Sequence, residues 1–244
     1  MLKALKTTIH YLNLRKIRLG KKYCPICEKP RRIIKLTDNE IAVRCISCKA
    51  SIVSMSIADV IVHELENLHK LHVYELSARG PLHKYLRSKC ENFIGSEFYP
   101  EIKSGDYNNG ILCQDVENLT FDSNSFDLCT STDVFEHVPD DFLGFKNIYR
   151  VLKPTGKMIF TVPLYGDSTR QRVKVGENGN LEYLLPPEYH GDPISESGRI
   201  LAYRNYGFDI LDLLERVGFK EAKIVTPKLG SFWGIKRKVV VAQK

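Results

Sequence analysis

FDSNSFDLCTSTDVFEHVPDDFLGFKNIYRVLKPTGKMIFTVP, residues 121–163, is the stretch that decides the fold of this chain. Residues 126–130 are an apolar run followed by three small polar residues, which is typical of a buried parallel strand at its carboxyl end. Residues 142–152 place apolar side chains at helical spacing between a Pro-Asp-Asp start and a Lys-Pro-Thr-Gly stop. Residues 158–162 are a second apolar run, so the stretch predicts a strand, a helix and a strand.

This unit predicts an α/β fold in which a right-handed crossover joins two parallel strands. Sheets of this kind bind their ligands outside the carboxyl ends of the strands. We therefore expect a ligand to meet residues 131–137, which include Ser131, Thr132 and His137.

The pattern FDL, then VFEHVPD, a helix and RVLKPTGKMIFTVP, resembles class I S-adenosylmethionine-dependent methyltransferases, in particular the type 11-like group. The resemblance covers roughly residues 71–244. It implies a Rossmann-like seven-stranded sheet with helices on both faces and S-adenosylmethionine across the first four strand ends. It also implies transfer of an activated sulfonium methyl, for which the protein aligns the acceptor and, for a hydroxyl, removes a proton. That step requires no metal.

The tract HVYELSARGP, residues 72–81, predicts a strand that runs into a turn before a helix over residues 82–88. Such a turn must let the backbone approach an anion or a carboxylate closely. The family usually has glycines at alternate positions here, whereas this chain keeps one glycine, out of step. The resemblance implies that Glu75, Ser77 and Gly80 contact the methionine end of the cofactor.

Two further acidic residues end apolar runs upstream of the central stretch. Glu97 lies 22 residues after Glu75, about the spacing at which a carboxylate reaches a ribose diol. By resemblance, Glu97 would bind both ribose hydroxyls beside Phe98, and Asp115 with the amide of Val116 would contact adenine. The alternatives are a solvated loop glutamate and an aspartate that caps a turn.

Two CxxC pairs separated by 17 residues lie near the amino terminus, namely Cys24 with Cys27 and Cys45 with Cys48. Four thiolates at this spacing suit a tetrahedral structural zinc without an open position. Residues 31–36 and 40–44 predict the two strands of a zinc ribbon, joined at residues 37–39. Two disulfides are the alternative, which the absence of a signal peptide disfavours.

The formal charge of +7 is concentrated in residues 1–50, which hold 13 Lys/Arg and 3 Asp/Glu. Residues 1–22 hold seven basic residues and no acidic one, and their apolar residues predict a basic amphipathic helix. Such a helix would contact an anionic membrane or nucleic acid, or alternatively pack on the next domain. No apolar run is long enough for a transmembrane segment, so we expect a cytoplasmic protein, membrane-peripheral at most.

The expected domain plan is a basic helix at 1–22, a zinc ribbon at 23–53, a linker helix at 54–70 and a methyltransferase domain at 71–244, with a substrate lid at 164–206. The lid shows little periodicity, and acceptor specificity should lie there. His190, in a proline-rich stretch of the lid, is the first candidate for the general base, and His137 is the second. The alternative for His137 is a structural residue beside the cofactor.

The polar lid and a catalytic domain without excess positive charge favour a small-molecule or glycan methyl acceptor, such as a sugar in surface-polysaccharide biosynthesis. RNA methylation, with the basic zinc module holding phosphates, is a first alternative. A catalytically silent binding module, suggested by the glycine-poor loop, is a second.

Overall fold

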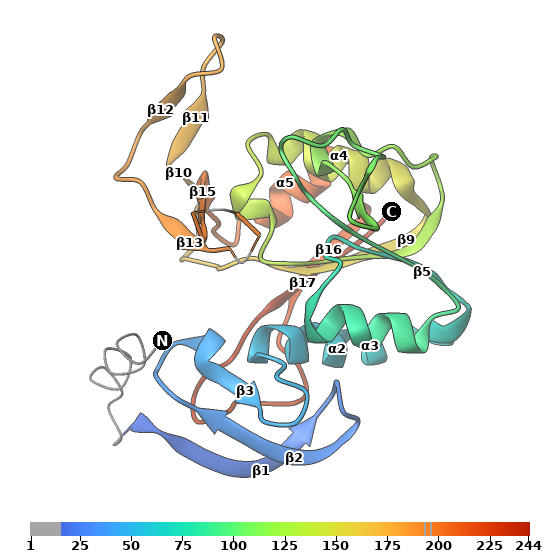
Figure 1. The fold of residues 1–244 in the computed structure, drawn as a ribbon, viewed down its shortest axis with the longest axis vertical. Helices are drawn as coiled ribbons and strands as arrows, with labels where there is room; N and C mark the ends of the chain where they lie inside the picture. Colours follow the sequence, from blue (N-terminus) through green and yellow to red (C-terminus); the bar gives the residue numbers. More distant parts are fainter. Residues whose placement is uncertain (1–15, 193, 196) are drawn as a thin grey trace.

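The computed structural model describes residues 16–192, 194–195 and 197–244, and its centre is an eight-stranded sheet (Figure 1). The strand order is β16-β17-β9-β8-β4-β5-β7-β6. The strands are β4 (His72–Glu75), β5 (Asn92–Glu97), β6 (Tyr107–Asn108), β7 (Ile111–Cys113), β8 (Phe126–Thr132), β9 (Leu152–Thr161), β16 (Glu221–Val225) and β17 (Val239–Gln243). The expected α/β fold is confirmed, and the two-residue β6 adds an eighth strand to the seven expected.

The sheet is mixed, with a parallel centre. The strands β7, β5, β4, β8 and β9 run parallel, whereas β17 is antiparallel to both of its neighbours. The carboxyl ends of the parallel strands therefore meet along one edge, where the cofactor residues were expected.

Helices cover both faces of the sheet (Figure 1). One face carries α2 (Ile52–Glu64) and α3 (Gly80–Lys89), and the other carries α4 (Asp141–Val151) and α5 (Ile210–Val217). The start of α4 is fixed by Asp140, whose side chain accepts a hydrogen bond from the amide of Leu143 at 2.9 Å. This N-cap explains why the Pro-Asp-Asp sequence correctly predicted the start of the helix.

The amino-terminal module is a three-stranded antiparallel sheet of β1 (Arg18–Cys24), β2 (Lys29–Lys35) and β3 (Val43–Cys45). Two expectations for it were wrong. Residues 18–22 belong to β1 and not to a helix, because all seven residues of this strand pair with β2. Residues 40–42 form a 3₁₀ turn and not a strand, because Asn39 caps them by accepting a hydrogen bond from the amide of Ile41 at 2.9 Å. Residues 1–15 of the expected basic helix lie outside the described residues.

The helix expected at 54–70 as a linker begins at Ile52 and ends at Glu64, and it is a layer of the fold. Residues 52–61 are all buried, because one side of α2 packs on the amino-terminal module and the other on the sheet. Seven of these ten residues are apolar, as is typical of a helix buried on more than one side. The chain then leaves through a turn in which Asn67 has a φ of 52°.

The lid at 164–206 is built from three short two-stranded ribbons and is not irregular. These are β10 (Arg170–Gln171) with β15 (Arg204–Asn205), β11 (Val173–Val175) with β12 (Leu181–Tyr183), and β13 (Tyr189–Gly191) with β14 (Arg199–Leu201). The ribbon of β11 and β12 projects away from the body (Figure 1). Strands of two or three residues are too short to produce a recognisable alternation, so periodicity could not predict them.

Among the described residues, no helix combines the length and the apolar character that a membrane crossing requires.

We expect Phe145→Ala to lower the free energy of unfolding by about 3–5 kcal/mol, because it removes a fully buried aromatic side chain. The ring of Phe145 stacks on that of Phe135 with centroids 3.9 Å apart. Urea denaturation measures the change. Tyr107→Ala is the control, since Tyr107 is 68% exposed, and a loss of similar size in both variants would contradict this assignment of the core.

Candidate active site and cysteine cluster

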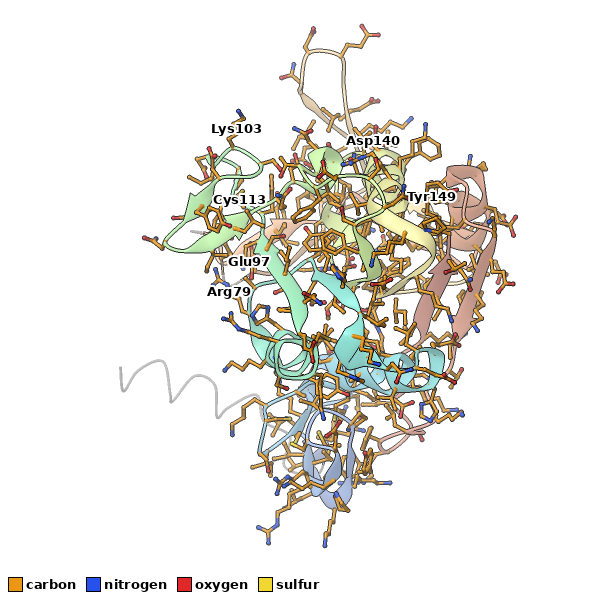
Figure 2. All side chains as sticks on the ribbon, turned by 90° about the vertical axis from the view of Figure 1, so that its right-hand side faces the viewer. Arg79, Glu97, Lys103, Cys113, Asp140 and Tyr149 are labelled. Carbon is orange, nitrogen blue, oxygen red and sulfur yellow. The ribbon has the colours of Figure 1, made fainter. Side chains whose placement is uncertain are left out.

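The turn after β4 is held in place by Glu97, at the end of β5. The Oε1 atom of Glu97 accepts hydrogen bonds from the amide of Ala78 at 3.0 Å, the hydroxyl of Ser77 at 3.2 Å and Nε of Arg79 at 3.1 Å. Figure 2 shows the side chains of Arg79 and Glu97 next to each other. Among the described residues, no hydrogen bond engages the second carboxylate oxygen, Oε2. Glu97 thus fixes the turn with one oxygen and can offer the other to a ligand.

The facing strand allows the turn to pack closely without the usual run of glycines. A Cβ at Gly95 would lie 2.7 Å from the ring of His83 and 2.9 Å from the carbonyl oxygen of Ser77. His83 in turn places Nδ1 3.0 Å from that same carbonyl oxygen. Gly80, at a φ of +83°, opens α3 directly after the turn. Gly95 therefore lets the turn pack closely against β5.

The residues expected to contact the cofactor lie at the carboxyl ends of the parallel strands or in the turns that follow: Glu75, Ser77, Gly80, Glu97, Phe98, Asp115, Val116, Ser131 and Thr132. Phe98 is 51% exposed beside Glu97, and the hydroxyl of Ser131 is buried without a hydrogen-bond partner. Asp115 accepts a hydrogen bond from the amide of Glu117 at 2.9 Å, so the turn cap considered as its alternative is present. Contact of these residues with a cofactor stays a prediction.

Glu75 is a buried carboxyl group at the end of β4. It accepts a hydrogen bond from the hydroxyl of Thr130 on β8. Burial raises the pKa of Glu75 to about 8, although the bond from Thr130 opposes the shift. This carboxyl group ties β4 to β8 just before the turn that follows β4.

The two histidines proposed as bases meet beyond the end of β8. Nδ1 of His190 lies 3.2 Å from Nε2 of His137, and each of these atoms lies 3.8 Å from Oε1 of Glu136. Burial lowers the pKa of His137, and burial followed by the charge of Asp133 raises the pKa of Glu136. The structure thus brings both predicted bases together, and it adds Glu136, to which the sequence reasoning gave no role.

A second ring of contacts orients this cluster. Nδ1 of His137 lies 2.8 Å from the carbonyl oxygen of Leu201, and Nε2 of His190 lies 3.1 Å from Oε1 of Glu188. Glu188 is held by Arg172 at 3.2 Å and by the side-chain amide of Asn205 at 3.2 Å. The lid therefore fixes the orientation of both rings.

Arg204 fastens the lid to the turn that carries this cluster. The residue is 2% exposed, and its guanidinium donates hydrogen bonds to the carbonyl oxygens of Phe135 at 3.0 Å, Val138 at 2.5 Å and Pro139 at 2.6 Å. It also lies 3.3 Å from a carboxylate oxygen of Asp141. Sequence reasoning missed this residue, because its partners lie more than 60 positions away and no local pattern marks it.

Arg237 connects the amino-terminal module to the end of β8. Its guanidinium is 5% exposed and contacts the carboxylates of Glu40 and Asp133. Asp133 also accepts a hydrogen bond from the hydroxyl of Thr161 at 2.8 Å and has a φ of 51°. The loop that carries Arg237 runs between β16 and β17 and reaches the amino-terminal module (Figure 1).

The four cysteines of the CxxC pairs form one cluster in that module. Their Sγ atoms all lie within 4.8 Å of one another, with 3.7 Å between Cys24 and Cys48 and 4.0 Å between Cys27 and Cys45. A tetrahedral zinc site with Zn–S bonds of about 2.3 Å has sulfurs about 3.8 Å apart. The donor type, number and spacing therefore fit a structural zinc ion.

The raised pKa of Glu75 predicts a pH-dependent stability. The folded chain keeps the proton of Glu75 up to about pH 8, whereas the unfolded chain releases it near pH 4.5. The contribution of protonated Glu75 to the free energy of unfolding is fully present at low pH. It is lost as pH rises towards 8, by up to about 1.4 kcal/mol per pH unit. Glu75→Gln should thus gain stability relative to the wild type between pH 6 and 8 in urea titrations.

Glu91→Gln, at an exposed position, is the control for that comparison. A constant difference between Glu75→Gln and the wild type across this pH range would contradict the assignment of a protonated Glu75.

Three comparisons with known proteins agree with this geometry. The family model of a methyltransferase domain matches residues 77–160. The ubiquinone biosynthesis O-methyltransferase of Coxiella burnetii is 45% identical over 49 residues, which are 20% of this chain and 21% of that protein. The glycine/sarcosine/dimethylglycine N-methyltransferase of Actinopolyspora halophila is 38% identical over 84 residues, which are 34% of this chain and 15% of that protein. The matches thus span 21% or less of the length of these two relatives.

Among solved structures, one assigned as an S-adenosylmethionine-dependent methyltransferase from Listeria monocytogenes aligns with a TM-score of 0.50 and 14% identity. The alignment covers 78% of this chain and 97% of that chain. The structural alignment confirms the expected α/β fold. The family model supports a methyltransferase domain at residues 77–160.

Proposed function

We propose that this chain transfers the methyl group of S-adenosylmethionine to a hydroxyl-bearing small molecule. The observation that carries the proposal is the state of Glu97, which fixes the turn at 77–79 through Oε1 and leaves Oε2 for a ribose. The match of residues 77–160 to a methyltransferase domain gives independent support. In this proposal the cofactor lies across the ends of β5, β4 and β8.

The acceptor would lie between the end of β8 and the lid. Two imidazoles and the carboxylates of Glu136 and Glu188 gather there, and such groups hydrogen-bond hydroxyls and remove their protons. The His190 side chain is 28% exposed, so it can reach an acceptor, and it is the base that we favour over the less exposed His137. A sugar or another polyol is the acceptor class that this lining fits best, and a role in surface-polysaccharide assembly is our narrower proposal.

We further propose that zinc occupies the cysteine cluster and holds the amino-terminal module on the methyltransferase domain. The apolar core of this module is shared with α2 and with Phe232 of the loop between β16 and β17. A zinc ion there would stabilise the amino-terminal module, and with it the loop from which Arg237 contacts Asp133.

Calorimetric titration with S-adenosylmethionine tests the proposed cofactor site. We expect micromolar binding by the wild type, and binding weaker by roughly 10- to 100-fold in Glu97→Ala, because hydrogen bonds to a charged group are lost. Glu101→Ala, at an exposed position nearby, should bind like the wild type. No binding by the wild type, or equal binding by Glu97→Ala, would overturn the proposal.

The zinc proposal is tested by measuring metal content after dialysis against a chelator at neutral pH. The wild type should retain one zinc ion per chain, whereas Cys27→Ser should lose it and melt at least about 5 °C lower. Cys90→Ser is the control, because this cysteine lies in α3's C-cap and outside the cluster. Retention of zinc by Cys27→Ser would contradict the assignment.

RNA methylation is a second candidate, favoured by one feature of the amino-terminal module. Lys21 of β1 lies directly opposite Arg32 of β2, and exposed Tyr23 is on the same face of the sheet. Like charges opposite each other destabilise a sheet unless an anion neutralises them. Binding of an RNA oligonucleotide that falls steeply with salt, and that weakens in Lys21→Gln, would favour this candidate over a small acceptor.

A further inference from the structure

The carboxylate of Glu136 is buried and has no hydrogen-bond partner. The residue is 2% exposed, and neither Oε1 nor Oε2 receives a hydrogen bond among the described residues. Buried carboxylates are normally paired, bonded to several donors or bound to a metal ion. Oε1 instead faces two imidazole nitrogens at 3.8 Å, those of His137 and His190.

The hydrogen bonds made by the outer nitrogens assign the protons of these rings. Nδ1 of His137 faces the carbonyl oxygen of Leu201, which can only accept, so Nδ1 carries the proton and Nε2 carries a lone pair. Nε2 of His190 faces the carboxylate of Glu188, so in the neutral ring Nδ1 carries the lone pair. Two lone pairs and a carboxylate oxygen therefore point at one another, an arrangement that a cation between them would stabilise.

The spacing of the three donor atoms fits a metal ion. They form a triangle with sides of 3.2, 3.8 and 3.8 Å. A point equidistant from its corners lies about 2.1 Å from each of them, which is the usual length of a bond from zinc to imidazole nitrogen or carboxylate oxygen. Histidine ligands in metal sites also donate their other N–H to a carbonyl or a carboxylate, as both rings do here.

We propose that Glu136, His137 and His190 bind a divalent cation of the Zn²⁺, Mn²⁺ or Co²⁺ class, in a site distinct from the cysteine cluster. Three protein ligands leave coordination positions open, and two imidazoles with one carboxylate are a ligand set of catalytic metal sites. Two ligands belong to the turn after β8 and one to the lid, so the cation also joins the lid to the methyltransferase domain.

Use of this site in methyl transfer rests on the proposed function, whereas metal binding does not. With the cation bound, His190 would be a ligand and would no longer be the base, and an acceptor hydroxyl on an open position of the cation would lose its proton more readily. The acceptor oxygen then forms its bond to the methyl carbon while the S–CH₃ bond breaks and leaves its electron pair on sulfur. The products are a methyl ether and S-adenosylhomocysteine, and the proton passes to water.

Cobalt titration of the full chain tests the site, after dialysis against a chelator has left zinc in the cysteine cluster alone. We expect one added Co²⁺ per chain, with visible ligand-field absorption and without the thiolate-to-cobalt charge-transfer band that binding at the cysteine cluster would give. Glu136→Gln and His190→Gln should each weaken cobalt binding by at least about 10-fold. Glu182→Gln, at an exposed position on β12 of the same lid, should bind cobalt like the wild type.

Circular dichroism and calorimetric titration with S-adenosylmethionine on the same variants separate the possible failures. If Glu136→Gln and His190→Gln lose cobalt binding but keep their fold and their cofactor binding, the metal site is supported. No cobalt beyond the cysteine cluster in the wild type, or unchanged binding in folded His190→Gln, overturns it and leaves a proton shared between the histidines. Either result leaves the proposed methyltransferase function standing, because cofactor binding is measured independently.

Discussion

The candidate site depends on the buried guanidinium of Arg204, which lies in the lid and donates hydrogen bonds to three carbonyl oxygens of the turn after β8. Backbone carbonyls at such depth need donors, and a buried cation needs acceptors, so each satisfies the other. This contact brings His190 of the lid to His137 of the turn at 3.2 Å.

The amino-terminal module is coupled to the same edge of the sheet from the opposite side. Arg237 contacts Glu40 of the module and Asp133 at the end of β8, and it is almost fully buried. Breaking a buried ion pair by removing one partner is strongly destabilising, because it leaves an uncompensated charge. The module is therefore part of the structure that positions Asp133, and its cysteine cluster serves the site indirectly.

Local sequence patterns predicted the helices and strands of the layers, but they could not predict contacts between residues far apart in the sequence. The apolar run at 126–130 lies within β8, and all but the last residue of the run at 158–162 lies within β9, because burial on both faces leaves a continuous apolar signal. The four cysteines were also predictable, since metal-ligand spacing is local. Arg204 and Arg237 were not, because their partners lie 63 to 197 positions away. Glu136 stood in the quoted turn, but its lack of a partner is visible only in three dimensions.

The central claim is that the cofactor lies across the strand ends between Glu97 and the end of β8. A crystal structure of the full chain with S-adenosylhomocysteine tests it most directly. We expect ribose hydroxyls on the free oxygen of Glu97, adenine beside Asp115 and the sulfur facing His137. A cofactor bound elsewhere, or a ribose that makes no contact with Glu97, would contradict it.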